Sequence, residues 1–196
     1  MILLRNKKWA SQIGPGCSTL QELREQPLDG EVLVAFATGV IVPKDVLDRV
    51  RVAYNFHPAS PQYPGRDPHH WAIYEKADSF GATCHIMTER VDEGPIVRVV
   101  RFPVLPGTRP HQLCRMAEQA AFSLYRELSP TLLDGSAAPN GEAWCGVKRT
   151  RSDFNKICEL HPDINESEFR LRYFSFSSPG YKNLFTRIYN IKFYTD

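Results

Sequence analysis

Asn55 and His57 are the first residues in the chain whose types and spacing could do chemistry. An asparagine amide can donate to a carbonyl oxygen that becomes an oxyanion, and a histidine can carry a proton or act as a second donor. Two residues apart on an extended strand, they project to the same side. The alternative is that both side chains only satisfy backbone groups at a strand end, and this pair alone does not decide between the two.

Asp92 and His85 form a second group with possible chemistry. An acidic residue followed by Glu-Gly is common in turns. If Asp92 met a histidine at the end of a neighbouring strand, it would hold the imidazole in one tautomer or relay a proton from an attacking amine. His69 and His70 follow a proline-rich loop, but no further ligand lies at helical spacing, so we expect no metal site.

The elements expected around Asn55 and His57 are those of a βαβ unit. Residues 31–42 are a nearly continuous apolar run, which is typical of a strand buried on both faces of a parallel sheet. Residues 43–50 predict a helix opened by Pro43, and residues 51–57 predict a second strand. Because open α/β sheets place their sites at the carboxyl ends of strands, Asn55 and His57 lie where a site is expected.

The remaining chain predicts further elements. Residues 58–70 read as a rigid loop, followed by a short helix over 71–77 and two strands over 81–91 and 95–104, with a tight connection at 92–95. A long helix is expected over 109–133, with Leu113, Met116, Ala120, Leu124 and Leu128 on one face. After a linker over 134–143 come two short helices, capped by Ser152 and Asn165, and a β-hairpin over 181–196 with its turn at Asn190.

Composition limits the class of protein. The 196 residues carry a net charge of +2, so nucleic acid is an unlikely partner. The five cysteines are scattered, which favours free thiols in a reducing compartment. No apolar run approaches the length of a membrane span or of a signal-peptide core, so we expect a cytoplasmic protein without membrane contact.

Five motifs in order resemble the 10-formyltetrahydrofolate-dependent formyltransferases. The family pattern is N-x-H-P, a Pro-Gly loop, a W/A-I helix, G-x-T-x-H and D-x-G. In this chain the corresponding residues are Asn55-Phe-His57-Pro58, Pro64-Gly65, Trp71-Ala-Ile73, Gly81-Ala-Thr83-Cys-His85 and Asp92-Glu-Gly94. The resemblance covers residues 31–104.

The resemblance implies an α/β fold: a Rossmann-like formyltransferase core over residues 1–134, shortened at its N-terminus. Fewer residues precede Asn55 than in the family, with residues 1–6 available for one strand and 17–26 for one helix. Residues 135–196 would form a small C-terminal α+β appendage ending in the hairpin. An exposed hairpin of alternating pattern invites pairing, so a homodimer through it is possible.

The resemblance also implies residue roles. Asn55 would hold the formyl oxygen, His57 would stabilise the tetrahedral oxyanion, and Asp92 would manage protons through water, with His85 and Thr83 supporting them. The co-substrate 10-formyltetrahydrofolate would lie near Thr38, Gly39, Val40, Met87, Glu89 and Arg90, and no metal is needed. The amine substrate would approach from the side of Tyr63, His70 and Trp71.

The acceptor expected from the short C-terminal region is a small primary amine, foremost that of a nucleotide-linked amino sugar. The alternatives are an amino acid, a siderophore amine, a carrier-bound aminoacyl group or methionyl-tRNA. A reading of another class is a folate-binding or scaffold protein with little turnover.

Overall fold

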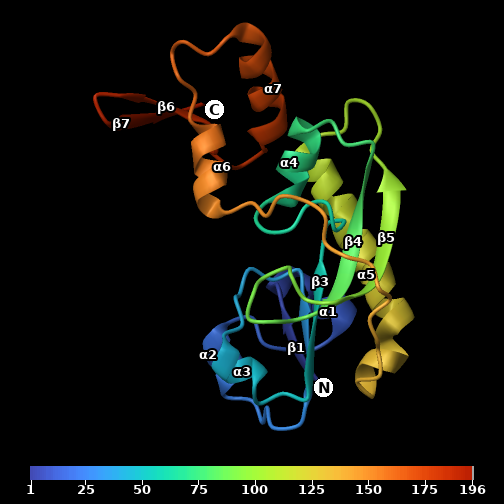
Figure 1. Cartoon of the computed structure of the whole chain (residues 1–196). Helices are drawn as coiled ribbons and strands as arrows, with labels where there is room; N and C mark the ends of the chain where they lie inside the picture. The colour runs from blue at the N-terminus through green and yellow to red at the C-terminus, as the bar shows by residue number, and fades with distance from the viewer. Residues whose placement is uncertain (196) are drawn as a thin grey trace.

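The computed structural model describes residues 1–195 and centres on a five-stranded sheet (Figure 1). The strands are β1 (Ile2–Arg5), β2 (Val32–Phe36), β3 (Val52–His57), β4 (Ser79–Ile86) and β5 (Ile96–Pro103), and they lie in this order across the sheet. β1, β2 and β3 are parallel, whereas β4 and β5 join antiparallel. The first strand and the helix α2 (Leu20–Arg24) confirm the elements expected from residues 1–6 and 17–26.

The central strand β2 is shorter than predicted. All five of its residues are buried, as expected for a strand covered on both faces. The predicted strand over 31–42 was wrong beyond Phe36, because Ala37 adopts a positive φ of 44° and the chain leaves the sheet. The connection between β4 and β5 is likewise a nine-residue loop, 87–95, rather than the tight connection expected.

Helices cover both faces of the sheet. The short elements are η1 (Lys7–Trp9), α1 (Ala10–Ile13), α3 (Lys44–Leu47) and α4 (Pro68–Tyr74). One face packs against α5 (Pro110–Leu133) and Trp9 of η1, and the other against Leu23 of α2 and Val46 of α3. The sheet therefore has a hydrophobic core on each side.

The helix α5 has a slightly different buried face from the one predicted. Leu113 and Leu124 are fully buried as expected, and Ala117 and Ala121 lie between them. Met116, which was predicted to face the core, is exposed, whereas its neighbour Ala117 is buried in an apolar cluster with Leu113 and Phe80.

The C-terminal region comprises α6 (Arg151–Cys158), α7 (Glu166–Phe176) and the hairpin of β6 (Phe185–Ile188) and β7 (Ile191–Tyr194). A separate apolar cluster joins it to α4. Asn165 caps α7 as predicted, whereas α6 is capped by Thr150 and not Ser152, because Thr150 and Asp153 exchange hydrogen bonds as a capping box. The boundary at residues 134 and 135 stays a prediction.

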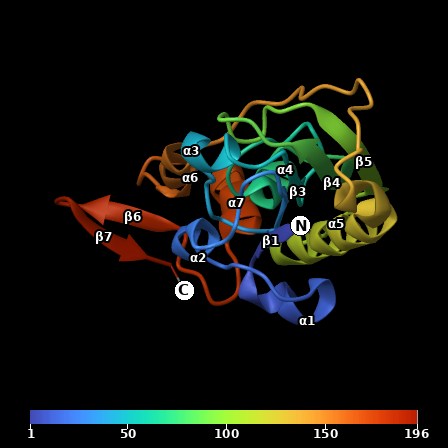
Figure 2. The same cartoon turned by 90° about the horizontal axis from the view of Figure 1, so that it is seen from below.

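The hairpin extends away from the rest of the molecule in both views (Figures 1 and 2). Tyr189 and Asn190 form its two-residue turn, and both have positive φ. That geometry matches the twist of the strands, and it confirms the predicted turn at Asn190. Within residues 1–195, none of the helices is both long and apolar enough to cross a membrane.

Candidate active site

The sheet register brings the predicted catalytic pair beside the predicted supporting residues. Asn55 and His57 occupy the carboxyl end of β3, and the antiparallel strand β4 places His85 opposite Asn55 and Thr83 opposite His57. The four side chains come from two motifs that lie almost thirty residues apart in sequence. Hydrogen bonding between the backbones of β3 and β4 therefore fixes the spacing of these four residues, independently of their side-chain contacts.

Asp92 reaches this group from the loop between β4 and β5. Its side chain is only 3% exposed, and its backbone has a positive φ of 51°. The carboxylate lies between both histidines: Oδ2 is 3.5 Å from Nδ1 of His57, and Oδ1 is 3.4 Å from Nε2 of His85. The backbone N–H of Gly65 donates to Oδ2 at 2.9 Å. The structure thus brings Asn55, His57, His85 and Asp92 together.

The environment keeps Asp92 ionised. Burial alone would raise the pKa of this carboxyl, because it disfavours the charged form. Attraction to the protonated forms of the His57 and His85 rings, together with the N–H of Gly65, outweighs that effect and holds the pKa well below its ordinary value. Asp92 is therefore a carboxylate at neutral pH.

The hydrogen bonds of His85 define its tautomer. Nδ1 lies 2.9 Å from the carbonyl oxygen of Ile86, and because a carbonyl only accepts, Nδ1 carries the proton. In the neutral ring Nε2 is then an acceptor, and the amide of Asn55 donates to it at 3.1 Å. The same amide nitrogen makes only a long contact of 3.5 Å with Asp92. One N–H of Asn55 therefore donates to His85. The other makes only the long contact with Asp92, so it can turn more easily toward a bound ligand.

The imidazole of His57 is held by the loop that follows β3. Its Nε2–H donates to the backbone carbonyl of Tyr63 at 3.0 Å, which turns Nδ1 toward Asp92. Thr83 fixes the start of the same loop, since its buried hydroxyl donates to the carbonyl of Ala59 at 2.7 Å. Thr83 acts on this loop and does not itself contact Asp92.

A cavity of about 500 Å³ opens beside these residues. Asn55, His57, His85 and Asp92 line it together with the loop after β2 and the loop after β4. Of the residues predicted to hold the co-substrate, the following line this cavity: Thr38, Gly39, Val40, Met87 and Arg90. Glu89 does not line it, although both of its neighbours, Thr88 and Arg90, do.

The three residues predicted on the substrate side do not line the cavity. His70 and Trp71 are buried between α4 and α7: His70 Nδ1–H donates to the carbonyl of Ser175, and the Trp71 ring packs edge-on against Phe176. Both side chains pack against Phe176 of α7, so they form part of the contact between α4 and the C-terminal region. Tyr63 meets the site through its backbone carbonyl alone. Burial raises the pKa of its phenol to about 12, and its ring packs on Phe80.

Sequence reasoning missed two groups near the site. Besides Arg90, four basic residues line the cavity: Arg66, Lys148, Arg149 and Arg151. Three of them lie in the run Lys148-Arg149-Thr150-Arg151, and that density of positive charge was the available signal. The second is Trp144, whose indole packs edge-to-face on both His57 and His85. The only sequence signal for a role of Trp144 was its position beside a stretch rich in glycine and proline.

Metal chemistry has no evident ligand set near this site. Within residues 1–195, no three His, Cys, Asp or Glu side chains gather in a way that could hold a metal ion. His69 and His70 lie side by side in α4, and burial lowers the pKa of His69 to about 3. The polar atoms around Asp92 are instead satisfied by one another and by backbone groups.

Solved structures share this architecture. A sugar N-formyltransferase from Shewanella sp FDAARGOS_354 matches 84% of this chain and 68% of its own, with 22% identity and a TM-score of 0.74. An N-formyltransferase from Helicobacter canadensis, solved with folinic acid and dTDP-3-aminofucose, matches 94% and 68%, with 18% identity and a TM-score of 0.68. An uncharacterised protein from Mycobacterium tuberculosis matches 100% of this chain and 95% of its own, with 18% identity and a TM-score of 0.76.

At these identities the structures establish a shared fold. The fold is the Rossmann-like α/β core expected from the motifs, followed by the C-terminal hairpin. Over residues 9–128 the sequence itself matches the family model described as formyl transferase, and this stretch contains Asn55, His57, His85 and Asp92. The chain therefore belongs to the formyl transferase family.

Proposed function

We propose that the protein transfers the formyl group of 10-formyltetrahydrofolate to the primary amine of a nucleotide-linked amino sugar. The observation that carries this proposal is the convergence of Asn55, His57 and Asp92 on one wall of a cavity large enough for a heterocyclic ligand. Relatives of the same fold support the ligand classes, since one was solved with folinic acid and dTDP-3-aminofucose.

The proposed reaction begins when the neutral amine attacks the formyl carbon. The new C–N bond forms as the carbonyl electron pair moves onto oxygen, and that oxyanion needs donors. Asn55 supplies one, because its second N–H makes only the long contact with Asp92 and can turn to the oxygen. His57 lines the same cavity and stabilises the developing negative charge when its ring carries both protons, with Nε2–H held by Tyr63 and Nδ1–H facing Asp92.

Collapse of the tetrahedral intermediate requires proton movement. The attacking nitrogen must lose a proton, and N10 of the departing tetrahydrofolate must gain one. Asp92 is placed to move this proton through a water molecule, because it is ionised and lies between both histidines. A carboxylate with so low a pKa holds a proton only transiently, which suits a relay more than a proton store.

The cofactor is proposed to lie against Thr38, Gly39 and Val40 on one side and Met87 and Arg90 on the other. The hydroxyl of Thr38 accepts from the N–H of Val40 at 3.2 Å, which restrains the turn of this loop. Backbone groups in such loops can recognise a pterin edge by hydrogen bonds.

The basic residues that line the cavity support a phosphorylated acceptor. Arg66 and Arg151 both lie near one oxygen of Asp67, at 3.3 and 3.5 Å, so two guanidinium groups share a single carboxylate. Guanidinium groups bind phosphate oxygens well because of their planar fork of donors. An amine carried on a nucleoside diphosphate fits this charge better than a free amino acid does.

The test is to incubate the protein with 10-formyltetrahydrofolate and a panel of amines, and to follow tetrahydrofolate release and formylated product. We expect turnover with an amino-sugar nucleotide, lost in Asn55→Ala and Asp92→Asn and kept in the matched control Asp163→Asn, whose carboxylate is exposed. Turnover confined to amino acids, carrier-bound amines or methionyl-tRNA would contradict the sugar assignment. Folate binding without turnover on any amine would support a scaffold instead.

We also propose that two copies pair through the hairpin. The exposed apolar side chains of β6, β7 and their turn are Ile188, Tyr189, Ile191, Phe193 and Tyr194. A two-stranded ribbon is only marginally stable alone, and its free edges favour pairing with an identical ribbon. Light scattering should give a dimer at micromolar concentration, and a monomer for the wild type would end this proposal.

A further inference from the structure

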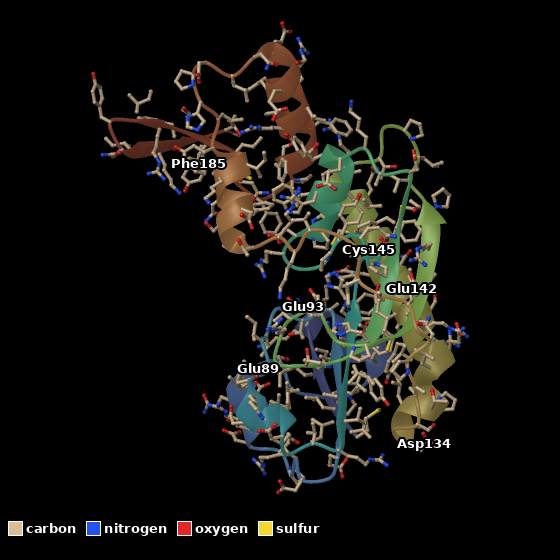
Figure 3. All side chains as sticks on the ribbon, viewed as in Figure 1. Glu89, Glu93, Asp134, Glu142, Cys145 and Phe185 are labelled. Atoms are coloured by element: carbon tan, nitrogen blue, oxygen red, sulfur yellow. The ribbon has the colours of Figure 1, made fainter. Side chains whose placement is uncertain are left out.

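The segment after α5, residues 140–150, crosses the candidate active site and is called the strap below. Figure 1 shows this part of the chain returning from the lower end of α5 along β5 and β4 toward α6. Its start is anchored to β5, because Asn140 N–H donates to the carbonyl of Ile96 at 2.9 Å and Glu142 pairs with Arg101. Figure 3 labels Glu142 and Cys145 on this segment beside the two strands.

The strap binds the loop over residues 58–67 along its length. Cys145 N–H donates to the carbonyl of Pro61, and Arg149 N–H to that of Pro64. The N–H of Arg66 donates back to the carbonyl of Arg149 at 2.8 Å. A Cβ on Gly146 would overlap the carbonyl oxygen of Gln62, so the strap lies against this loop at backbone distance. This is the loop whose residues contact His57 and Asp92.

The strap also holds the loop that carries Asp92. The indole N–H of Trp144 donates to the carbonyl of Gly94 at 2.8 Å, and Lys148 pairs with Glu93 at 2.8 Å. The same indole lies against the histidines, with centroid distances of 5.8 Å to His57 and 5.1 Å to His85 and interplanar angles of 65° and 85°. Edge-to-face contacts of this kind restrict ring orientation.

We propose that Trp144 is a positioning residue that sets the imidazole planes of His57 and His85 and, through Gly94, the place of Asp92. Trp144 is absent from the cavity wall, so it acts through these residues and not on the substrate. One side chain from outside the matched family region thereby contacts both histidines and the loop that carries Asp92. The consequence for turnover rests on the proposed formyl transfer, whereas the consequence for the imidazoles does not.

The test compares Trp144→Ala, Trp144→Phe and the strap control Val147→Ala, whose side chain is 66% exposed. Nitrogen-15 NMR at a pH where the imidazoles are neutral should show one tautomer for each ring in the wild type, protonated at Nδ1 in His85 and at Nε2 in His57. We expect averaged tautomer signals in Trp144→Ala. The control should match the wild type.

Turnover gives the second readout. We expect kcat of Trp144→Ala to fall about tenfold or more, because small misplacement of catalytic groups is costly, while the KM for the folate changes little. The kcat of Trp144→Phe should lie between those of the wild type and Trp144→Ala, because this variant keeps an aromatic ring but loses the hydrogen bond to Gly94. Gly146→Ala should reproduce the defect by displacing the strap with Trp144 intact.

The outcomes separate this inference from the proposed function. A wild type without turnover on any amine would refute formyl transfer, and the NMR comparison would still decide the role of Trp144. A folded Trp144→Ala with wild-type tautomer signals and, where the wild type turns over, unchanged kcat would overturn the inference. If Trp144→Ala does not fold, Trp144→Phe and Gly146→Ala decide: wild-type behaviour in both would overturn it.

Discussion

Gly65→Ala should weaken the fold and disable the site together, because one small residue serves both. Gly65 has a φ of +91°, its N–H donates to Asp92, and a Cβ there would overlap the carbonyl oxygen of Arg149. Alanine therefore forces a strained backbone and pushes the loop over residues 58–67 away from the strap. Asp92 then loses its backbone donor.

The magnitude follows from these contacts. A left-handed backbone costs a residue with a Cβ about 1–2 kcal/mol. The hydrogen bond to an ionised carboxylate contributes about 1.5–3 kcal/mol. Together they give a loss of about 2.5–5 kcal/mol in the free energy of unfolding, which a domain of ordinary stability survives. Turnover should fall about a hundredfold, because Asp92 is displaced.

Gly30→Ala is the matched control. Gly30 also has a positive φ, 76°, but a Cβ there meets nothing within 4 Å. The control should lose only the conformational part, about 1–2 kcal/mol, and keep wild-type turnover. Urea denaturation and the tetrahydrofolate-release assay measure both variants. Equal stability losses in Gly65→Ala and Gly30→Ala, with normal turnover in both, would refute the role given to Gly65.

Three further predictions concern the core and the carboxylate. Leu124→Ala should lose about 2–5 kcal/mol of unfolding free energy in urea, because this fully buried side chain joins α5 to the sheet. A loss below about 1 kcal/mol would mean that the surrounding core relaxes to fill the cavity left by the smaller side chain. Thr83→Val should lose about 1–2 kcal/mol by leaving the carbonyl of Ala59 without its donor, and stability equal to the wild type would contradict this contribution of Thr83. Because the pKa of Asp92 is lower in the folded than in the unfolded state, its contribution to stability is fully present above about pH 4 and lost as the pH falls toward the native pKa. The stability difference between wild type and Asp92→Asn should therefore shrink below that pH in acid titrations, and a difference independent of pH would contradict the assignment.

The local patterns of the chain determined most of the elements. The apolar run of β2, the periodicity of α5 and the cap at Asn165 are properties of neighbouring residues, so they could be read from the sequence. The end of β2 could not, because the positive φ of Ala37 is imposed by the loop that must turn around the cavity. Met116 and Ala117 show the same limit of sequence-based prediction. Which of two neighbouring helix residues faces the core depends on the surface that the helix packs against.

The roles of His70 and Trp71 depended on tertiary packing. Their types and place after the loop were compatible with a substrate-facing surface, but α4 is covered by α7, and both side chains became part of that contact. A helix face gives no indication in sequence of which distant helix will cover it. Burial between elements a hundred residues apart decided these two residues.

The sequence by itself determined which residues could do chemistry: Asn55, His57 and Asp92 are recognisable from motif order and from their expected place at strand ends. Only the tertiary structure decided how they are held. The antiparallel register of β3 and β4 set His85 against Asn55, and the strap brought Trp144 and Arg149 across two loops far away in sequence. Residue type and local spacing are written in the chain, whereas distances across a site are fixed by hydrogen bonds and packing between segments that meet only after folding.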